Sequence, residues 1–142
     1  MYSAKEAAEM TGLSTATLMY YEKEQLLPPI ARTSQKYRQY TDSDIEWIKM
    51  VQCLRRANVP IQSVKKYIAL LTKGGKTINQ RYDIVQDYIT NIQEQMSHLQ
   101  NALALARRKA AFYEKILQEP SNRDLAYTEE WKLFKNGEEE NE

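Results

Sequence analysis

The feature that most constrains this chain is a run of apolar residues in its second half, spaced alternately four and three apart. The run continues over more than five heptads. Such spacing puts the side chains in one narrow stripe on a helix, which is typical of a coiled-coil seam. At 1.5 Å per residue the helix is ~60 Å long, too long to fold back on a small domain. We therefore expect it to pair with a second copy of the chain. The stripe comprises Ile78, Tyr82, Val85, Ile89, Ile92, Met96, Leu99, Leu103, Ala106, Ala110, Tyr113 and Leu117.

We predict that the central and C-terminal parts of this stripe form the contact between two chains, although heptads alone do not fix the orientation of the helices. Pro120 is expected to end the helix. Beyond it, residues 127–134 predict one short amphipathic turn, and the closing residues 137–142, GEEENE, predict a disordered acidic tail. The predicted dimer contacts are Ile89, Ile92, Met96, Leu99, Leu103, Ala106, Ala110 and Tyr113.

The N-terminal segment carries signals for two short helices around a tight turn. Ser3 and Glu6 form a capping box, and Gly12 is expected to stop the helix that follows. Ser14 then caps a second helix over roughly residues 15–25. Two short helices joined in this way match the helix-turn-helix pattern.

The segment that follows predicts a hairpin and two further helices. Residues 30–40 indicate an extended hairpin, or wing, with a turn at residues 34–36. A capping box at Thr41 opens a third helix to about residue 57. A fourth helix is expected over residues 60–71, with Pro60 in its first turn.

Charge and composition narrow the possible function. The net charge of +1 divides into +3 over residues 1–70 (ten basic minus seven acidic) and −2 over the rest (ten minus twelve), which weakly favours nucleic acid as a partner of the N-terminal half. The lone Cys53 and lone His98 exclude an internal disulfide and argue against a zinc cluster and most catalytic sites. No apolar run approaches the ~20 residues that cross a bilayer, so no membrane contact is expected and the cytoplasm is the expected location.

Three segments occur in the order and spacing of a known family. TLMYYEKEQLLPP (residues 17–29), YRQY (37–40) and DSDIEWIKMVQCLRRANVPI (42–61) resemble the MerR family of regulators over residues 2 to about 72. The resemblance implies a mainly α fold, in which a winged helix-turn-helix DNA-binding domain precedes a long dimerisation helix in an antiparallel coiled coil. We accordingly expect a DNA-binding domain over residues 1–74, a dimerisation helix over 75–119 and a tail over 120–142.

The resemblance also implies a function, namely a transcriptional regulator that binds a palindromic promoter operator as a homodimer. Such a regulator affects RNA polymerase indirectly, because bending and untwisting the promoter brings the polymerase-recognition elements into line. No cofactor or metal is predicted. Met19 and the pair Gln35-Lys36 depart from the family's usual arginine and Asn-Gly, which suggests an altered operator or weaker affinity. The expected DNA-binding residues are Thr15, Thr17, Tyr20, Tyr21, Lys36, Tyr37, Arg38 and Tyr40.

Cys53 is the candidate effector-sensing residue. The segment around it resembles a MerR subgroup that responds to aldehydes and other electrophiles through a single cysteine, which implies a stress-response role. Lys49, Arg55 and Arg56 are close in sequence, and cations stabilise the reactive thiolate. The alternative is that Cys53 is an inert, half-buried small hydrophobe.

Two other functions remain open at this point. The chain could be a DNA-binding regulator or architectural factor with a non-covalent ligand or no effector. It could also be a coiled-coil interaction protein that does not bind DNA. An enzyme is not expected, since the sequence contains no phosphate-binding loop, metal cluster or recognisable pair of nucleophile and base.

Overall fold

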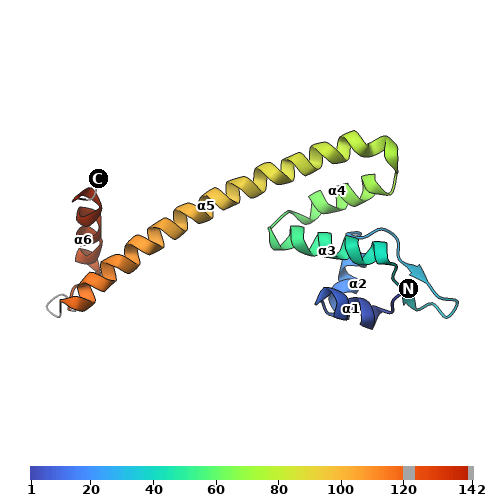
Figure 1. Ribbon diagram of the computed structural model, residues 1–142, viewed down its shortest axis with the longest axis horizontal. Coiled ribbons are helices and arrows are strands. Elements are labelled where there is room, and N and C mark those ends of the chain that lie inside the picture. The colour runs from blue at the N-terminus through green and yellow to red at the C-terminus, as the bar shows by residue number, and fades with distance from the viewer. Residues whose placement is uncertain (120–123, 141–142) are drawn as a thin grey trace. The chain divides into compact units, whose positions relative to one another are not determined.

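The computed structural model describes residues 1–119 and 124–140 of the chain. The described residues are mainly helical, and they divide into two compact units, Met1–Ile92 and Gln93–Glu142 (Figure 1). Helix α5 begins in the first unit and ends in the second. None of the helices in the described part of the chain has the length and apolar character that a membrane span requires.

Helices α1 (Ala4–Thr11) and α2 (Thr15–Lys23) form the predicted helix-turn-helix. The capping box of Ser3 and Glu6 is present, and Gly12 ends α1 in the left-handed region with a φ of 70°. The side chain of Ser14 caps α2. Helix α2 ends two residues before the predicted limit, because Gln25 adopts a φ of 58° and Leu26 donates its N–H to the Tyr21 carbonyl at 2.9 Å.

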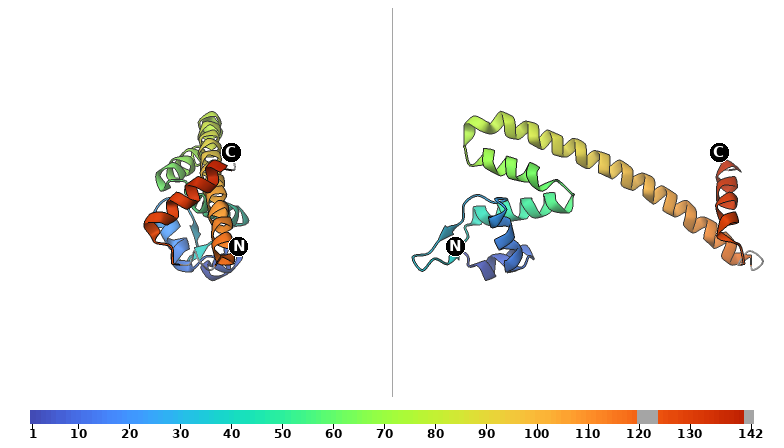
Figure 2. Two further views of the ribbon diagram at one scale, coloured as in Figure 1. Left: turned by 90° about the vertical axis from the view of Figure 1, so that its left-hand side faces the viewer. Right: turned by 180° about the vertical axis from the view of Figure 1, so that it is seen from behind.

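The predicted wing is an antiparallel hairpin of β1 (Ala31–Arg32) and β2 (Arg38–Gln39), which extends beyond the neighbouring helices (Figure 2). Its turn lies where the sequence predicted it. Lys36 donates its N–H to the Thr33 carbonyl at 2.8 Å and has a φ of 69°. In the left-handed region a residue with a side chain costs more energy than glycine, so Lys36 makes this turn less favourable than glycine would. The turn forms nevertheless. Backbone hydrogen bonds of 2.8 Å between Tyr2 and Tyr40 join the wing to the N-terminus.

Helices α3 (Asp42–Arg56) and α4 (Ile61–Leu71) follow the wing in the N-terminal unit, close to their predicted bounds. The capping box of Thr41 and Asp44 is present, and Pro60 stands at the N-cap of α4, one residue before the helix. Apolar side chains from α1 to α4 form one core, with buried members that include Ala7, Leu18, Leu26, Ile45, Ile48, Val51, Val64 and Ile68.

The first turns of α5 (Ile78–Gln118) belong to the same unit. After Gly74, with a φ of 86°, a 3₁₀ turn η1 (Gly75–Thr77) leads into α5. Tyr88 is buried and donates its hydroxyl to the Ser63 carbonyl of α4 at 2.9 Å. The start of α5 is therefore held against α4 by apolar contact and by this hydrogen bond.

The predicted apolar stripe of α5 is largely exposed to solvent in a single chain. The exposed fractions reach 70% for Leu99, 54% for Met96 and 50% for Leu103. Ile92 differs, because it is partly buried and packs against the core of the N-terminal unit. The stripe is thus an uncovered surface on both sides of Ile92.

Two predictions for the C-terminal unit are wrong. Residues 127–134 do not form a single turn, because α6 (Tyr127–Glu140) is a helix of 14 residues, and the GEEENE segment is helical to Glu140 rather than a disordered tail. Phe134 packs edge-on to Phe112 of α5, with ring centroids 5.6 Å apart, and Glu138 pairs with Arg108. These contacts stabilise a segment whose charge alone disfavours a helix. Pro120, the predicted helix terminator, lies outside the described residues.

Replacing Tyr88 with phenylalanine tests the contact between α4 and α5. Burial raises the pKa of Tyr88 to about 12, so the unfolded chain loses this proton near pH 10 and the folded chain near 12. Tyr88 therefore makes the protein less stable as the pH rises from 10 towards 12. We expect Tyr88→Phe to lower the free energy of unfolding by about 1 kcal/mol at pH 7. Above pH 10 the free energy of unfolding should fall less steeply with pH in the variant than in the unaltered chain.

Urea unfolding at fixed protein concentration and several pH values measures both effects. The control is Tyr37→Phe, at an exposed wing position. An alkaline decline of equal steepness in both variants would contradict the assigned role of Tyr88.

Candidate nucleic-acid interface

The N-terminal part of α2 presents several predicted contact residues at the surface. Thr15 is exposed, Thr17 is half-buried, and Tyr20 is 46% exposed. The hydroxyls of Ser14 and Thr17 lie 2.9 Å apart, and Ser14 accepts the Thr17 N–H at 3.1 Å. This end of the helix therefore offers short hydroxyl groups and the positive end of the helix dipole, both of which suit phosphate or base edges.

Tyr21 and Tyr40 occupy a different environment from the other predicted contacts. Tyr21 is 7% exposed and Tyr40 is fully buried, and burial raises the pKa of both phenols. The hydroxyl of Tyr40 has no hydrogen-bond partner among the described residues. We assign both side chains to packing, where they support α2 and the wing from within.

Glu22 connects the recognition helix to the wing. Its carboxylate accepts from Arg38 Nε at 2.5 Å and pairs with Arg32 Nη2 at 3.3 Å. Arg32 and Arg38 are directly opposite each other in the hairpin register, and like charges in that position repel. Glu22 offsets this repulsion and attaches both strands to α2, so the helix and the wing are positioned together.

The roles of Glu22 and Arg32 were not predicted from the sequence. The sequence did contain a signal for Arg32, a cation placed symmetrically with Arg38 about the predicted wing turn. No local pattern identifies Glu22, because its partners lie ten and sixteen residues away.

The tip of the wing leaves further groups exposed. Tyr37 is 70% exposed, Lys36 is exposed, and Arg32 Nη1 donates to the Lys36 carbonyl at 3.3 Å. The wing thus contributes three cations against one carboxylate from α2. Such an excess of positive charge suits a polyanion backbone.

Cys53 lies on α3 and is exposed, so the alternative of a half-buried cysteine is wrong as to its burial. Two of the three cations predicted to assist it have other partners. Arg55 Nη1 donates to the Val59 carbonyl at 2.7 Å, and Lys49 pairs with Glu46 at 3.5 Å. The thiol is accessible to small reagents.

His98 lies exposed on α5. Across residues 1–119 and 124–140, no three His, Cys, Asp or Glu side chains come together in a group that could hold a metal ion.

Comparison with known sequences gives concordant matches. The pattern of the MerR HTH family of regulatory proteins matches residues 2–71. An uncharacterized HTH-type transcriptional regulator of Haemophilus influenzae is 33% identical over 114 residues, which make up 80% of this chain and 84% of that protein. The HTH-type transcriptional regulator AdhR of Bacillus subtilis is 38% identical over 82 residues, 58% of this chain and 59% of AdhR.

Solved structures give the same result. HiNmlR, a MerR family regulator lacking the sensor domain and bound to promoter DNA, superposes with a TM-score of 0.78 at 32% identity. The match covers 84% of this chain and 94% of HiNmlR. A MerR family regulator from Listeria monocytogenes superposes with a TM-score of 0.80 at 30% identity, over 88% of this chain and 94% of the other.

Glu22→Gln tests the connection between α2 and the wing. Because these ion pairs are partly exposed, we expect the free energy of unfolding to fall by no more than about 1 kcal/mol. The larger effect should be local, with faster hydrogen exchange at the wing amides of Thr33 and Lys36.

The matched control is Glu24→Gln, which removes a similarly exposed ion pair with Lys65, of 3.1 Å, and does not touch the wing. Equal exchange at the wing amides in the two variants would show that Glu22 does not hold the hairpin.

Proposed function

Because this chain belongs to the MerR family of helix-turn-helix regulatory proteins, we propose that it acts in the cytoplasm as a homodimer on a palindromic promoter operator. Like its relatives, the chain is a DNA-binding transcriptional regulator and not an enzyme. One observation carries the proposal of a dimer, namely the exposed apolar stripe along α5.

The proposed DNA contacts come from α2 and the wing. The N-terminal end of α2 enters the major groove, with Thr15 and Thr17 near base edges or phosphates. Tyr20 contacts a phosphate of the DNA backbone. The wing supplies phosphate contacts through Lys36, Tyr37 and Arg38. We add Arg32, because it pairs with the same carboxylate of Glu22 as Arg38 does. Phosphate contacts fix the register of the protein on the duplex, and α2 reads the sequence. Tyr21 and Tyr40 act through packing, because they are buried.

The proposed dimer contact is the central and C-terminal part of the stripe. Met96, Leu99 and Leu103 are at least half exposed in one chain, and Ala106 and Ala110 have short side chains that allow a second helix to approach closely. Burying such side chains against a second α5 removes apolar surface from water, at roughly 25 cal/mol per Å². Antiparallel pairing is our proposal from the family, as is the division into a DNA-binding domain (1–74) and a dimerisation helix (75–119).

The dimer regulates transcription through the DNA. We assign RNA polymerase as an indirect partner, since a dimer that bends and untwists a promoter changes the relative position of the polymerase-recognition elements. Smooth bending of a site costs on the order of 1–6 kcal/mol, which the contacts of two domains can supply.

Cys53 is the proposed switch, and its exposure on α3 supports this role. The thiol adds to the carbonyl carbon of an aldehyde, a C–S bond forms, and the proton moves to the carbonyl oxygen. The competing function within the same family is a regulator with a non-covalent ligand or no effector, in which Cys53 has no role.

Arg38→Ala tests the phosphate contact. We expect weaker binding to all duplexes by a similar factor and a salt dependence shallower by about one unit of slope, because one phosphate contact is lost. Affinity for the chain's own upstream DNA and for an unrelated duplex, each titrated with salt, measures both quantities. Lys76→Ala, an exposed cation of η1, is the control. An unchanged slope in Arg38→Ala would remove Arg38 from the interface.

Leu103→Glu tests the dimer. A charge within the seam should dissociate it, since burying an unpaired carboxylate is costly. Leu105→Glu is a closely matched control, because Leu105 is 45% exposed against 50% for Leu103 and lies about 200° away around the helix.

Sedimentation at micromolar concentration distinguishes the states. The unaltered chain and Leu105→Glu should sediment at twice 16.7 kDa, and Leu103→Glu at 16.7 kDa. An unaltered chain that sediments as a monomer, or a Leu103→Glu dimer, would contradict the proposal.

Cys53→Ser tests the switch. The variant should bind operator DNA with unchanged affinity and lose the transcriptional response to a small aldehyde, because serine is not nucleophilic at neutral pH. In vitro transcription with and without aldehyde gives the readout. A response that persists in Cys53→Ser would assign sensing to another group.

A further inference from the structure

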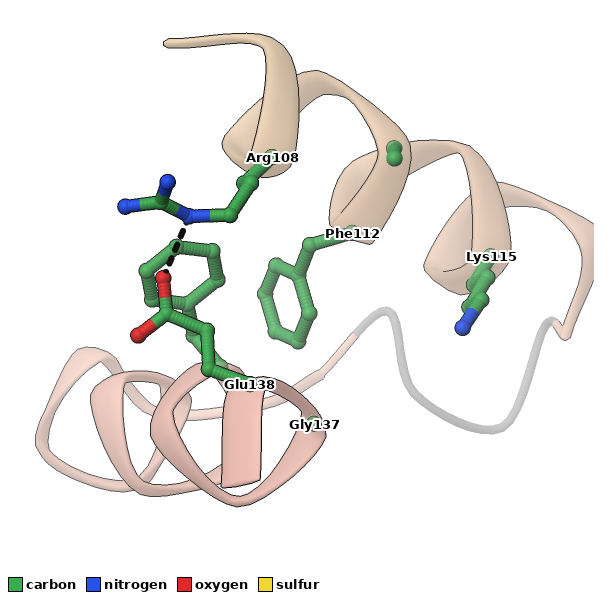
Figure 3. Close-up of a pocket in the computed structure, with 7 residues that line it drawn as sticks. Arg108, Phe112, Lys115, Gly137 and Glu138 are labelled. Atoms are coloured by element: carbon green, nitrogen blue, oxygen red, sulfur yellow. Dashed lines mark hydrogen bonds and ion pairs between the residues drawn. The ribbon is translucent and has the colours of Figure 1, made fainter. Parts of the chain in front are cut away.

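A pocket of about 460 Å³ lies within the C-terminal unit, between the last turns of α5 and helix α6. Figure 3 shows Arg108, Phe112 and Lys115 along one side of α5, facing α6. Helix α6 contributes Phe134, Gly137 and Glu138. The volume falls within the range of ~300–1,000 Å³ that is typical of small-molecule sites. None of these residues has a part in the proposed DNA contact.

The aromatic part of the pocket is formed by Phe112 and Phe134. Their ring centroids lie 5.6 Å apart with an interplanar angle of 75°. The ammonium of Lys109 lies 4.3 Å from the centroid of Phe134, which helps to hold this ring in place. Two fixed phenyl groups at a steep angle suit a flat aromatic ring, which can stack on one and meet the edge of the other.

The charged part of the pocket has an excess of cations. Arg108 and Lys115 lie on either side of Phe112, and the one carboxylate on the lining is that of Glu138. Glu138 accepts only from Arg108 Nε, at 2.6 Å, and Figure 3 shows the two terminal guanidinium nitrogens directed away from it. Those nitrogens are suitable donors to a ligand carboxylate, for which a guanidinium has matching geometry.

Gly137 shapes the wall of the pocket on the side of α6. Glycine in a helix interior costs roughly 0.5–1 kcal/mol relative to alanine, yet Gly137 lies within α6. No atom of the described residues lies within 4 Å of where its Cβ would be, so packing does not require the glycine. Its φ is not in the left-handed region either. The missing side chain leaves the wall of the pocket open.

We propose that this pocket binds a small, flat aromatic carboxylate. The ring lies against Phe112 and Phe134, and the carboxylate accepts from the terminal N–H groups of Arg108. All of the lining comes from one chain, and none of it belongs to the proposed DNA contacts.

The test uses the full chain labelled with ¹⁵N and 2-naphthoate as the probe. The chain has four glycines, Gly12, Gly74, Gly75 and Gly137, whose amide signals fall in a sparse spectral region. The Gly137 signal is assigned by its absence in Gly137→Ala. We expect it to shift saturably with 2-naphthoate, with a Kd on the order of 1 mM or tighter for a probe of this size. The other three glycine signals should not move.

Two variants separate charge recognition from simple loss of the Arg108–Glu138 pair. Both Arg108→Gln and Glu138→Gln break that pair, so a purely structural effect would change affinity in the same direction. We expect Arg108→Gln to bind about tenfold more weakly, because a charge-assisted hydrogen bond is lost. Glu138→Gln should bind more tightly, because the competing carboxylate is removed. Gly137→Leu should abolish binding by filling the pocket.

Several outcomes would overturn the proposal. One is an unmoved Gly137 signal at probe concentrations up to 10-fold above the expected Kd of about 1 mM. Another is equal affinity for the neutral 2-naphthamide. Equal shifts at all four glycines, or unchanged binding in Gly137→Leu, would also contradict it. Weaker binding in both Arg108→Gln and Glu138→Gln would also overturn it, since it would show that the ion pair is needed only to hold α6 in place.

Discussion

The apolar stripe along α5 is the constraint on which the rest of the account depends. A single chain leaves side chains such as Leu99 and Leu103 in water. In the proposed dimer, a second α5 covers them. Two-fold pairing would duplicate the winged helix-turn-helix and match it to a DNA site with the same symmetry. In this proposal, the need to bury the stripe determines the two-fold symmetry of the operator.

Within one DNA-binding unit, the corresponding constraint is the pairing of Glu22 with Arg38 and Arg32. Opposed arginines destabilise a two-stranded hairpin, and the carboxylate on α2 stabilises them. The same contact sets the distance between α2, which we propose reads bases, and the wing, which we propose binds phosphates. Glu22 therefore has a structural role among basic residues, and because it contacts Arg38 through Nε, the terminal guanidinium nitrogens of Arg38 remain suited to phosphate.

The features that could be predicted from sequence are those determined by local chemistry. Capping residues located α1, α2 and α3, and heptad spacing located α5. Features that depend on contacts distant in sequence could not be predicted. Tyr20 and Tyr21 are adjacent and identical in type, so only tertiary packing decides which is buried. The helix α6 similarly depends on Phe134 packing against Phe112, which the acidic composition of the segment gives no reason to expect.

The most direct test of the central claim is the number of chains on one operator. Native mass spectrometry of the complex with the chain's own upstream promoter DNA, combined with hydroxyl-radical footprinting, measures stoichiometry and symmetry together. The account predicts two chains of 16.7 kDa per duplex and two protected half-sites related by two-fold symmetry. One chain bound per duplex, with a single protected patch at full affinity, would contradict it.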